Sequence, residues 1–520
     1  MHFFAGYNRR YFIVVALAGL ALRLFFVWRY PLITFDATVY GDIAKNWLLT
    51  GTFGMSENGG VVPTFIRLPG YPMFLGLVWL LSGIEHYRAV ELTQALIDLA
   101  GCLVIAGIAR QLLHQTAGRI AFALAALCPF LAVYAAVPQT ETLSIFFSAT
   151  ALYCAQRGLR EIRWARWFML CGASLGAAML VRPDGVILLA AIAGYVLWSG
   201  LRISKVKFRC LRRSLAAVLL LGICALAPLL PWTVRNWRVF HQVQPLAPRY
   251  ANAPGEFVPH GFHRWVKTWI VDFVSTEEVF WKVSADVPGE AVDVTRLPAR
   301  AFDDPAEYAE TANLFAQYNR DTFITPGLDA QFANLAARRV RNSPLRFYLW
   351  LPLARVADMW LRPRTETLPI ETRWWEYEEH EGESQIAIAM LLLNAALLGS
   401  ALAAPLVARQ AGNAGFSRST VGAKDSPAQG PSEQERGPRN QVPQNFGSKE
   451  RGLQHPGLML TFIFLRSVLL ATLENPEQRY TLECFPAVLA LSAATLSWLP
   501  LLWKRFIPPK VMRANQRQAA

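Results

Sequence analysis

Charge is scarce in this sequence, and its scarcity excludes an ordinary soluble enzyme. Of the 520 residues, 17% are Asp, Glu, Lys or Arg, whereas 53% are hydrophobic. The apolar residues are gathered in blocks of about 15 to 24, close to the roughly 20 residues that a helix needs to cross the hydrocarbon core of a bilayer. The composition therefore predicts an all-α, polytopic membrane protein.

Cysteine is absent from both long polar loops. Six of the seven cysteines lie in or beside apolar segments, and Cys210 lies in a basic loop, so we predict neither a disulfide framework nor a Cys-rich metal site. His260 and His263 have the spacing of two ligands on a helix, but Pro259 and Gly261 disfavour a regular helix there. We therefore predict no cofactor and no metal site, and the sequence leaves a divalent-metal requirement open.

A signal-peptide cleavage site is also missing at the N-terminus. The apolar run from Tyr11 to Trp28 is longer than the core of a signal peptide, and no small-residue cleavage site follows it. We interpret this run as an uncleaved first span. The ten predicted spans are residues 11–28, 89–109, 119–137, 141–157, 167–181, 184–200, 214–232, 385–408, 457–473 and 483–503.

Two further apolar segments are predicted to lie on the outer membrane surface. Residues 71–84 number only fourteen, too few for a span. Residues 345–362 are long enough, but charged side chains interrupt them and the apolar ones share one face, which is typical of an interfacial amphipathic helix.

Basic residues indicate the orientation, because Lys and Arg gather on the cytoplasmic side of membrane proteins. With ten spans, 26 basic and five acidic residues fall on the cytoplasmic side, which leaves 25 basic and 32 acidic residues for the rest of the chain. The net charge of +14 is thereby explained without nucleic acid as a partner. Both termini are predicted to be cytoplasmic.

This topology divides the chain into five parts. They are an N-terminal transmembrane module at 1–232 that contains a first outer loop at 29–88; an extracytoplasmic cap at 233–384 that contains the amphipathic helix 345–362; a span at 385–409; a linker at 410–456; and a C-terminal pair of spans with a basic tail at 457–520. The linker is rich in Gly, Pro, Ser, Gln and charge, so we predict that it is disordered.

Two acids follow the first span. Asp36 and Tyr40 are four residues apart and would share one face of a helical turn, whereas Asp42 would point about 120° away. Only one of the two acids is therefore expected to face a given substrate. The alternative for Asp36 is a helix N-cap, and the alternative for Asp42 is a solvated or capping role.

Arginines at the outer ends of the spans are candidates for binding an anion. Arg67 precedes a Pro-Gly-Tyr-Pro turn, where the prolines fix the backbone and the glycine permits close approach to a ligand. An arginine held there is suited to bind a phosphate through two parallel hydrogen bonds. The alternatives are a headgroup anchor for Arg67 and an ion pair with Asp184 or Glu141 for Arg182.

Further candidate substrate-binding residues lie at the same predicted level of the membrane. They are Tyr71, Glu141, Arg235, Arg479 and Tyr480. Arg235 follows Trp232, a combination that is also typical of an interfacial anchor. Arg466 lies within a predicted span and should face the bundle, but the sequence does not identify its partner.

Together these residues resemble the motifs of the GT-C glycosyltransferases, specifically family 39 and its bacterial relatives, which include protein mannosyltransferases and the lipid A aminoarabinose transferase. The matching residues are Asp36 with Tyr40 and Ala44, Arg67-Leu-Pro-Gly-Tyr-Pro72, Gln94-Ala-Leu-Ile-Asp98, Gln139-Thr-Glu141-Thr-Leu143, Val181-Arg-Pro183, Pro231-Trp-Thr-Val-Arg-Asn236, Pro344-Leu-Arg-Phe-Tyr348 and Glu477-Gln-Arg-Tyr480.

The resemblance implies a polyprenyl- or dolichyl-phosphate sugar as donor and an inverting transfer on the outer face of the bacterial inner membrane, with the bilayer as a partner. It implies that Asp36 is the catalytic base. Arg67 and Arg182 are the first candidates to bind the lipid phosphate, followed by Arg235 and Arg479. Family members often carry two adjacent acids in the first outer loop, but Ala37 follows Asp36 here. The sugar and the acceptor, whether glycan, lipid or protein, are left open.

Two other functions are compatible with the same motifs. A transporter or flippase for lipid-linked sugars would place its charged residues near the membrane midplane, whereas here they cluster at the outer rim below a cap of about 150 residues. A ligase that transfers whole lipid-linked glycans would share the chemistry but use a diphosphate donor.

Overall fold

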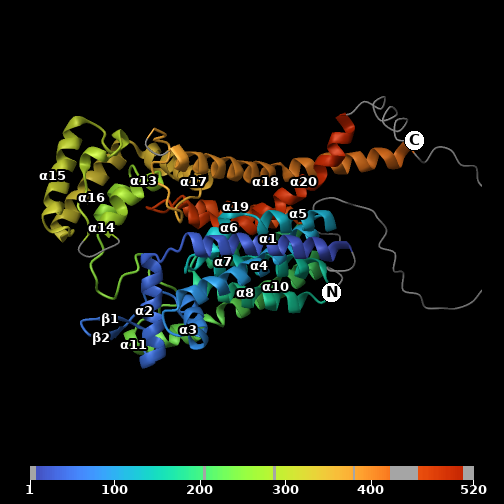
Figure 1. Ribbon diagram of the computed structural model, residues 1–520, viewed down its shortest axis with the longest axis horizontal. Coiled ribbons are helices and arrows are strands. Elements are labelled where there is room, and N and C mark those ends of the chain that lie inside the picture. The colour runs from blue at the N-terminus through green and yellow to red at the C-terminus, as the bar shows by residue number, and fades with distance from the viewer. Residues whose placement is uncertain (1–6, 203–206, 285–288, 379–380, 422–454, 507–520) are drawn as a thin grey trace, which may run out of the picture.

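The computed structural model describes residues 7–202, 207–284, 289–378, 381–421 and 455–506. Most of them form an elongated bundle of helices (Figure 1). Within the described residues, six helices are long and apolar enough to cross a membrane, and up to eight spans result if each of two bent helix pairs counts as one. The prediction of a polytopic helical membrane protein is confirmed, but the predicted number of ten spans is not confirmed.

In the described part of the chain, twelve helices make up the bundle. They are α1 (Tyr7–Arg29), α4 (Tyr87–Leu112), α5 (Gln115–Ala126), α6 (Pro129–Ala135), α7 (Glu141–Arg160), α8 (Trp164–Val181), α9 (Gly185–Arg202), α10 (Lys207–Leu226), α11 (Leu229–Phe240), α18 (Glu381–Val421), α19 (Pro456–Leu470) and α20 (Phe485–Phe506). The pair α5 and α6 is bent by 51°, and the pair α10 and α11 by 45°. Pro129 and Pro228 lie at these breaks, where a proline cannot continue the hydrogen bonding of a helix.

Two predicted spans are not among the candidates found in the described residues. The helix at 457–473 is α19, which has only 15 residues, about 22 Å at the rise of an α-helix. The helix at 141–157 is α7, which has 20 residues but buries polar side chains, among them Ser144, Ser148 and Gln156.

The predicted linker at 410–456 is only partly described. Its first residues continue α18, whose backbone is helical as far as Val421. Residues 422–454 of the linker, and the predicted basic tail beyond residue 506, lie outside the described residues.

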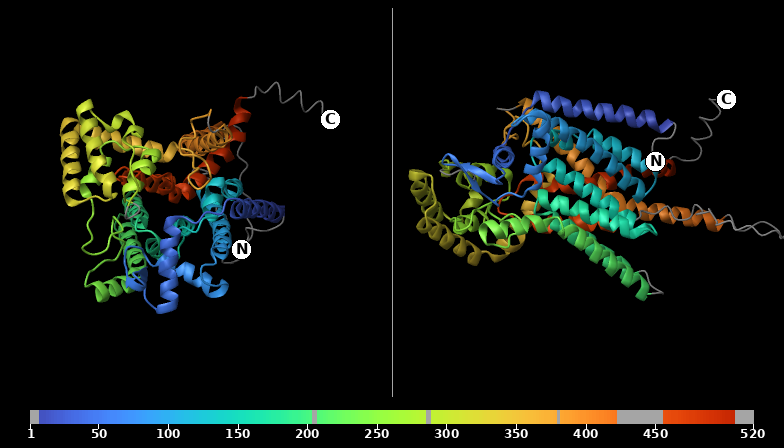
Figure 2. Two further views of the ribbon diagram at one scale, coloured as in Figure 1. Left: turned by 60° about the vertical axis from the view of Figure 1, so that its left-hand side comes forward. Right: turned by 90° about the horizontal axis from the view of Figure 1, so that it is seen from below.

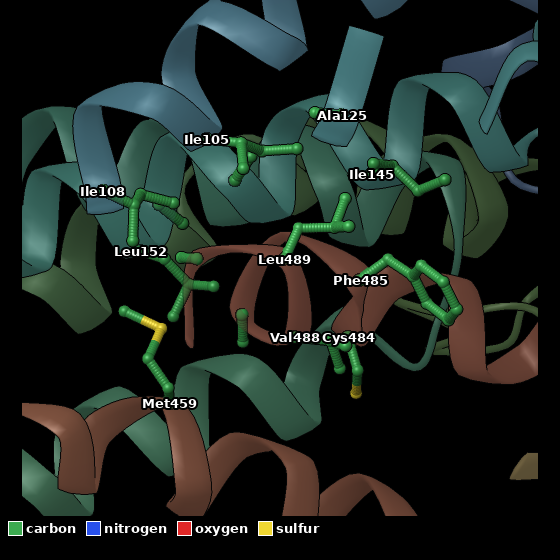
Figure 3. Close-up of a cluster of buried hydrophobic side chains, with 14 of the residues drawn as sticks. Ile105, Ile108, Ala125, Ile145, Leu152, Met459, Cys484, Phe485, Val488 and Leu489 are labelled. Atoms are coloured by element: carbon green, nitrogen blue, oxygen red, sulfur yellow. The ribbon is translucent and has the colours of Figure 1, made fainter. Parts of the chain in front are cut away.

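The core of the bundle lies around α20. Figure 3 shows Leu489 of α20 among apolar side chains of the neighbouring helices, such as Ile105 of α4 and Ile145 of α7. Ala487, Ala490 and Ala493 of α20 are completely buried, and such small residues let helix backbones approach closely in membrane proteins. The segment that precedes α20 is therefore held firmly against the bundle.

The first outer loop has more structure than the sequence analysis predicts. It contains α2 (Phe35–Thr50), an antiparallel hairpin of β1 (Gly54–Glu57) and β2 (Gly60–Pro63), and α3 (Gly70–Ser82). At the tip of the hairpin, Asn58 and Gly59 have φ values of 48° and 81°, which is why an Asn-Gly pair closes this turn. The hairpin corrects the all-α prediction locally.

Helix α3 does not cross the bundle. Gly70 at its start lies so close to Leu180 near the end of α8 that an added Cβ would be 2.6 Å from the Leu180 carbonyl oxygen. Its side chain Trp79 contacts Tyr87 at the start of α4, with 5.4 Å between the ring centroids. Both ends of α3 therefore lie at one end of the bundle, as predicted for a segment too short to span.

The cap has its own hydrophobic core. It consists mainly of α12 (His260–Val266), α15 (Pro305–Asp321) and α16 (Pro326–Asn342), with the short elements α13 (Phe273–Ser275), η2 (Thr276–Trp281), α14 (Lys282–Ser284), η3 (Val294–Arg296) and η4 (Ala299–Ala301). Trp265, Trp269 and Phe332 are fully buried in this core. These tryptophans stabilise the cap itself.

The segment predicted to be amphipathic connects the cap to the bundle. It forms η5 (Arg346–Trp350) and α17 (Leu351–Leu361). Arg355 is completely buried, and its Nε donates to the Ile270 carbonyl oxygen of the cap at 2.8 Å. Leu349 and Leu353 are 46% and 53% exposed, so an apolar face remains open, as the amphipathic pattern predicts.

The bundle has two chemically different ends. The cap, α2 and the hairpin lie together at one end, which we call the site end, and the first residues of α1 lie at the other (Figures 1 and 2). Residues from the predicted cytoplasmic clusters meet at this other end, where Arg160 donates to Gln111 O at 2.7 Å and Arg213 to Glu161 O at 3.0 Å. This separation supports the predicted topology, while the orientation in the membrane stays a prediction.

Candidate active site

Asp36 lies in the first turn of α2, and Thr34 is the residue that caps this helix. The Thr34 hydroxyl accepts from Ala37 N at 3.2 Å and from the Gln139 side-chain amide at 2.8 Å. The Asp36 carboxylate is therefore not used as an N-cap, and each of its oxygens accepts from an arginine instead. Arg67 donates to Oδ1 at 3.0 Å, and Arg479 donates to Oδ2 at 3.2 Å.

The two arginines determine the charge of Asp36. Burial alone would raise the pKa of this carboxyl group, but the Arg479 and Arg67 guanidinium groups outweigh burial, and the pKa lies below its ordinary value. Asp36 is therefore ionised at neutral pH. Its side chain is 29% exposed, so it is accessible to a substrate.

Tyr40 and Tyr71 extend the site on the side of α2 and α3. The Arg67 guanidinium lies 5.7 Å from the centre of the Tyr40 ring, and Tyr40 contacts Tyr71 edge to face at 5.1 Å. Asp36 and Tyr40 thus share the face of α2 that meets Arg67, as their spacing predicts. Burial raises the pKa of Tyr40 to about 12, which keeps this phenol neutral, and Tyr71 is oriented by a hydrogen bond to Gln94 at 2.7 Å.

Arg479 comes from the turn that precedes α20. This turn contains η6 (Gln478–Cys484), a 3₁₀-helix. The Glu477 carboxylate fixes the side chains of Arg479 and Tyr480, because it accepts from Arg479 Nε at 2.6 Å and from the Tyr480 hydroxyl at 2.6 Å. The guanidinium carbons of Arg479 and Arg182 each lie 5.5 Å from the centre of the Tyr480 ring.

Behind this layer, Arg182 binds three carboxylates. It lies 2.9 Å from Glu141, 3.3 Å from Asp184 and 3.0 Å from Glu483. Burial would lower the pKa of Arg182, but these acids raise it well above its ordinary value. Both ion pairs that the sequence analysis names as alternatives for Arg182 are therefore present.

Arg466 finds its partners in the same layer. Its guanidinium lies 2.6 Å from Asp184 and 3.2 Å from Glu483, and its side chain is completely buried. The sequence places Arg466 in the bundle but does not identify these carboxylates. The available signal was Glu483, an acid at the start of a long apolar run, where ionisable groups usually have a function or a partner.

Two predicted site residues, Asp42 and Arg235, lie away from this group. The Asp42 carboxylate accepts from Ser56 N and from Ser56 Oγ, each at 2.6 Å. Arg235 donates to the carbonyl oxygens of Thr64 and Phe53, each at 2.7 Å. Both side chains fasten the hairpin region, so in this structure they stabilise the first outer loop and do not line the site.

The charges of the site nearly balance. In the described part of the chain, the connected ion pairs join four arginines, Arg67, Arg182, Arg466 and Arg479, with five carboxylates, Asp36, Glu141, Asp184, Glu477 and Glu483. An anion that enters must therefore compete with a carboxylate for an arginine. Arg67 is the arginine most available to an anion. Among the described residues it pairs with one carboxylate, that of Asp36, and its buried Nε has no hydrogen-bond partner.

The sequence matches one family model. Residues 66–232 match the model for dolichyl-phosphate-mannose-protein mannosyltransferase. The matched region contains Arg67, Tyr71, Glu141 and Arg182, whereas Asp36 and Arg479 lie outside it. Comparison with curated protein sequences gave no match.

The solved structures that the chain matches include an archaeal oligosaccharyltransferase and a bacterial protein, ArnT. The oligosaccharyltransferase of Archaeoglobus fulgidus, crystallised with a tethered acceptor peptide, has a TM-score of 0.50 and 13% identity over 98% of this chain and 52% of that one. The present chain thus spans about half the length of that protein. ArnT from Cupriavidus metallidurans, bound to undecaprenyl phosphate, has a TM-score of 0.37 and 15% identity over 96% of this chain and 80% of that one. The chain is a polytopic membrane protein with the GT-C fold, and it is similar to the family 39 glycosyltransferases.

Proposed function

We propose that this protein is a glycosyltransferase that moves one sugar from a polyprenyl-phosphate donor to a hydroxyl group of an acceptor on the outer face of the membrane. The observation that carries the proposal is the Asp36 carboxylate held between Arg67 and Arg479 at one end of a membrane bundle. The description of the matched family, a dolichyl-phosphate-mannose-dependent transferase, supports a lipid monophosphate as the leaving group.

The reaction needs one base and at least one cation. The acceptor oxygen forms a bond to the anomeric carbon as the bond between that carbon and the phosphate oxygen breaks, and the acceptor proton passes to Asp36. The lipid phosphate leaves with the bonding electron pair, so negative charge grows on it, and arginines stabilise this charge. A single displacement of this kind inverts the configuration of the anomeric carbon.

The same arginines connect donor binding to the basicity of Asp36. While Arg67 and Arg479 bind the carboxylate, its pKa is lowered and it is a weak base. A lipid phosphate that takes hydrogen bonds from these arginines weakens their hold on Asp36. The carboxylate then becomes more basic at the moment when the sugar is in place.

The arginines have different tasks in this proposal. Arg67 and Arg479 contact Asp36 directly and bind the phosphate. Arg182 is already bound by three carboxylates, so it positions Glu141 and the Tyr480 ring. This ranking differs from the sequence-based expectation, which puts Arg182 ahead of Arg479.

The test is transfer by the purified full chain in proteoliposomes. The donors are undecaprenyl monophosphates that carry a radiolabelled hexose or pentose, and the measurements are release of free lipid phosphate and appearance of labelled acceptor in a membrane extract. Wild-type protein should release lipid phosphate, and D36N should not.

Other outcomes would overturn the proposal in identifiable ways. Turnover of diphosphate-linked glycans with no turnover of any monophosphate donor would indicate a ligase. Movement of the intact donor across the bilayer without release of lipid phosphate would indicate a flippase.

A further inference from the structure

A small cavity lies where the cap meets the bundle, behind the turn that carries Arg479. Its volume is about 170 Å³, below the roughly 300–1,000 Å³ of pockets for drug-sized ligands, so it has room for one small ring. Phe273, Glu277 and Trp281 of the cap line one side. Arg362, Glu366, Trp374 and Gln478 are among the residues that line the other sides.

The lining combines flat apolar surfaces with hydrogen-bonding groups. Phe273 and Trp281 contact each other edge to face, with 5.2 Å between their ring centroids, and Trp374 lies in the same lining. The carboxylates of Glu277 and Glu366 and the amide of Gln478 supply polar atoms. A sugar ring has this same pairing of surfaces, because its C–H faces are apolar while its edge carries hydroxyl groups.

Several of the polar atoms have no partner of their own. Glu366 accepts from the Tyr134 hydroxyl at 2.6 Å through Oε1, but its buried Oε2 lacks a hydrogen-bond partner among the described residues. The buried Gln478 Oε1 and Trp374 Nε1 also lack hydrogen-bond partners among the described residues. Buried polar groups without partners are costly. Arg362 Nη1, in the same lining, also lacks a hydrogen-bond partner among the described residues. Hydroxyl groups, which both donate and accept, are suitable partners for these atoms.

The pKa of the Glu366 carboxyl group is raised, which is compatible with a neutral ligand. Burial raises the pKa of this carboxyl group above its ordinary value, although Tyr134 and Arg364 act in the opposite direction. Arg364 donates to the Gln478 carbonyl oxygen at 2.7 Å. Two carboxylates, Glu277 and Glu366, line the cavity against one arginine, Arg362, which pairs with Asp358 at 3.7 Å, so the lining does not favour a phosphate.

The cavity is separated from Asp36 by a single turn of backbone. Gln478 lines the cavity, and the next residue, Arg479, donates to Asp36. Arg364 holds this turn from the other side. A ligand in the cavity would therefore lie beside the segment whose next side chain, Arg479, contacts Asp36.

We propose that this cavity is the acceptor subsite and that it binds one uncharged sugar ring of a glycan or glycolipid. The assignment rests on the proposed function, because it defines the acceptor of the same reaction. It identifies the acceptor as a carbohydrate, whereas the sequence leaves glycan, lipid and protein open.

Direct binding is measured without donor, so that it is independent of turnover. The full chain in lipid nanodiscs is titrated with methyl α-D-glucopyranoside and with methyl α-D-mannopyranoside, and saturation-transfer NMR reports contact with the protein. At least one glycoside should bind wild-type protein, and E366Q and W374L should each weaken its binding about tenfold or more, since a lost buried hydrogen bond or ring contact has that effect. The exposed Glu378 provides the matched control, E378Q, which should bind like wild type.

Kinetics distinguish an acceptor site from a site for the donor sugar. E366Q and W374L should raise the KM for a sugar acceptor about tenfold while the KM for the donor and the thermal midpoint remain unchanged. A change in the donor KM alone would assign the cavity to the donor sugar and overturn the proposal. Equal glycoside binding by wild type and both variants, or no binding by wild type, would also overturn it, even if transfer to another class of acceptor confirmed the proposed function.

Discussion

The guanidinium of Arg479 lies 3.2 Å from the carboxylate of Asp36, although 443 positions separate the two residues in the chain. Asp36 lies in the first turn of α2, soon after α1, and Arg479 lies in η6, just before α20. The ion pair therefore closes the site between the two ends of the sequence. Because Arg67 binds the other carboxylate oxygen, Asp36 is the point at which three separate segments meet.

Replacing Asp36 should abolish most of the transfer activity. We expect D36N to lower kcat by about 10²- to 10⁴-fold, the usual contribution of a general base, in assays of lipid-phosphate release. D42N is the matched control, since an asparagine there can still accept from Ser56, and it should retain most of the activity. Near wild-type turnover by folded D36N would remove Asp36 from the mechanism.

Arg67 should act mainly on the donor. R67K keeps the positive charge but loses the planar fork that binds two phosphate oxygens. We expect its KM for the donor to rise about 10- to 100-fold, which corresponds to roughly 1.4 to 2.8 kcal/mol, while its KM for the acceptor changes little. R346K, at an ion pair with Asp303 on the cap surface, should leave both values unchanged. The opposite pattern, with only the acceptor KM affected, would contradict the phosphate assignment.

The pH dependence should reveal the competition between Asp36 and the phosphate for arginine. Activity requires ionised Asp36, so it falls as the pH drops through the pKa of this group. In the free protein Arg479 and Arg67 hold that pKa below its ordinary value, despite burial. In the donor complex the phosphate draws the arginines away, so the pKa rises.

The acid limb of kcat, which reports the complex, should therefore lie at higher pH than the acid limb of kcat/KM, which reports the free protein. The measurement is a pair of pH profiles over the acidic range. In R479Q, one of the two arginines that lower the pKa of Asp36 is missing. The acid limb of kcat/KM should therefore move to higher pH, toward the acid limb of kcat. Coinciding limbs in wild-type protein would mean that donor binding leaves Asp36 and its arginines together.

The sequence indicated several residues of the site but not all of the ion pairs that they form. The spacing of Asp36 and Tyr40 placed both on one helix face, and the turn after Arg67 placed that arginine nearby, because both are local properties of the chain. The pairing of Arg466 with Asp184 and Glu483 was not predictable. It depends on how α9, α19 and the turn before α20 pack together, and hydropathy reports nothing about such packing.

Two of the predicted substrate-binding residues lie apart from the others. Arg235 and Asp42 have the residue types and the position expected of ligands for a polar substrate, yet they bind Phe53, Thr64 and Ser56 of the first outer loop. A charged side chain near a membrane surface has the same sequence pattern whether it binds a substrate or a backbone carbonyl. The hairpin that needs these contacts is marked only by Asn58-Gly59.

Asp358 should make the junction of cap and bundle sensitive to pH. Burial raises its pKa to about 6, while Arg362 lowers it and Asp272 raises it. The folded state therefore holds this proton more tightly than the unfolded chain, whose ordinary value is 3.8. Protonated Asp358 stabilises the folded state fully below pH 3.8. This stabilisation decreases as the pH rises from 3.8 to about 6, and it is absent at higher pH.

D358N removes this titration. At pH 8 it should be more stable than wild type, on the order of 1 to 3 kcal/mol, and the difference should disappear near pH 4. Thermal unfolding at the two pH values is the measurement. D321N, at an exposed position on the cap, should show no such difference, and a D358N protein that is less stable at pH 8 would contradict the argument.

The buried pair of Arg23 and Asp98 should stabilise the bundle only while both charges are present. Arg23 Nε donates to Asp98 at 2.7 Å, and Arg23 Nη1 donates to the carbonyl oxygens of Gly19 and Ala126, each at 2.7 Å. Their side chains are 0% and 4% exposed. Removing one partner of such a pair costs about 3 to 5 kcal/mol, because it leaves a buried charge uncompensated.

R23M should therefore lower the thermal midpoint strongly, whereas the double variant R23M/D98L should recover most of the loss, since two apolar side chains suit this interior. R29M, at the exposed end of α1, controls for the loss of an arginine from the same helix. A double variant as unstable as R23M would show that the carbonyl contacts of Arg23, and not its charge partner, hold α1 in place. Since α1 ends six residues before Phe35, where α2 begins, loosening α1 should also raise the donor KM through Asp36 and Arg67.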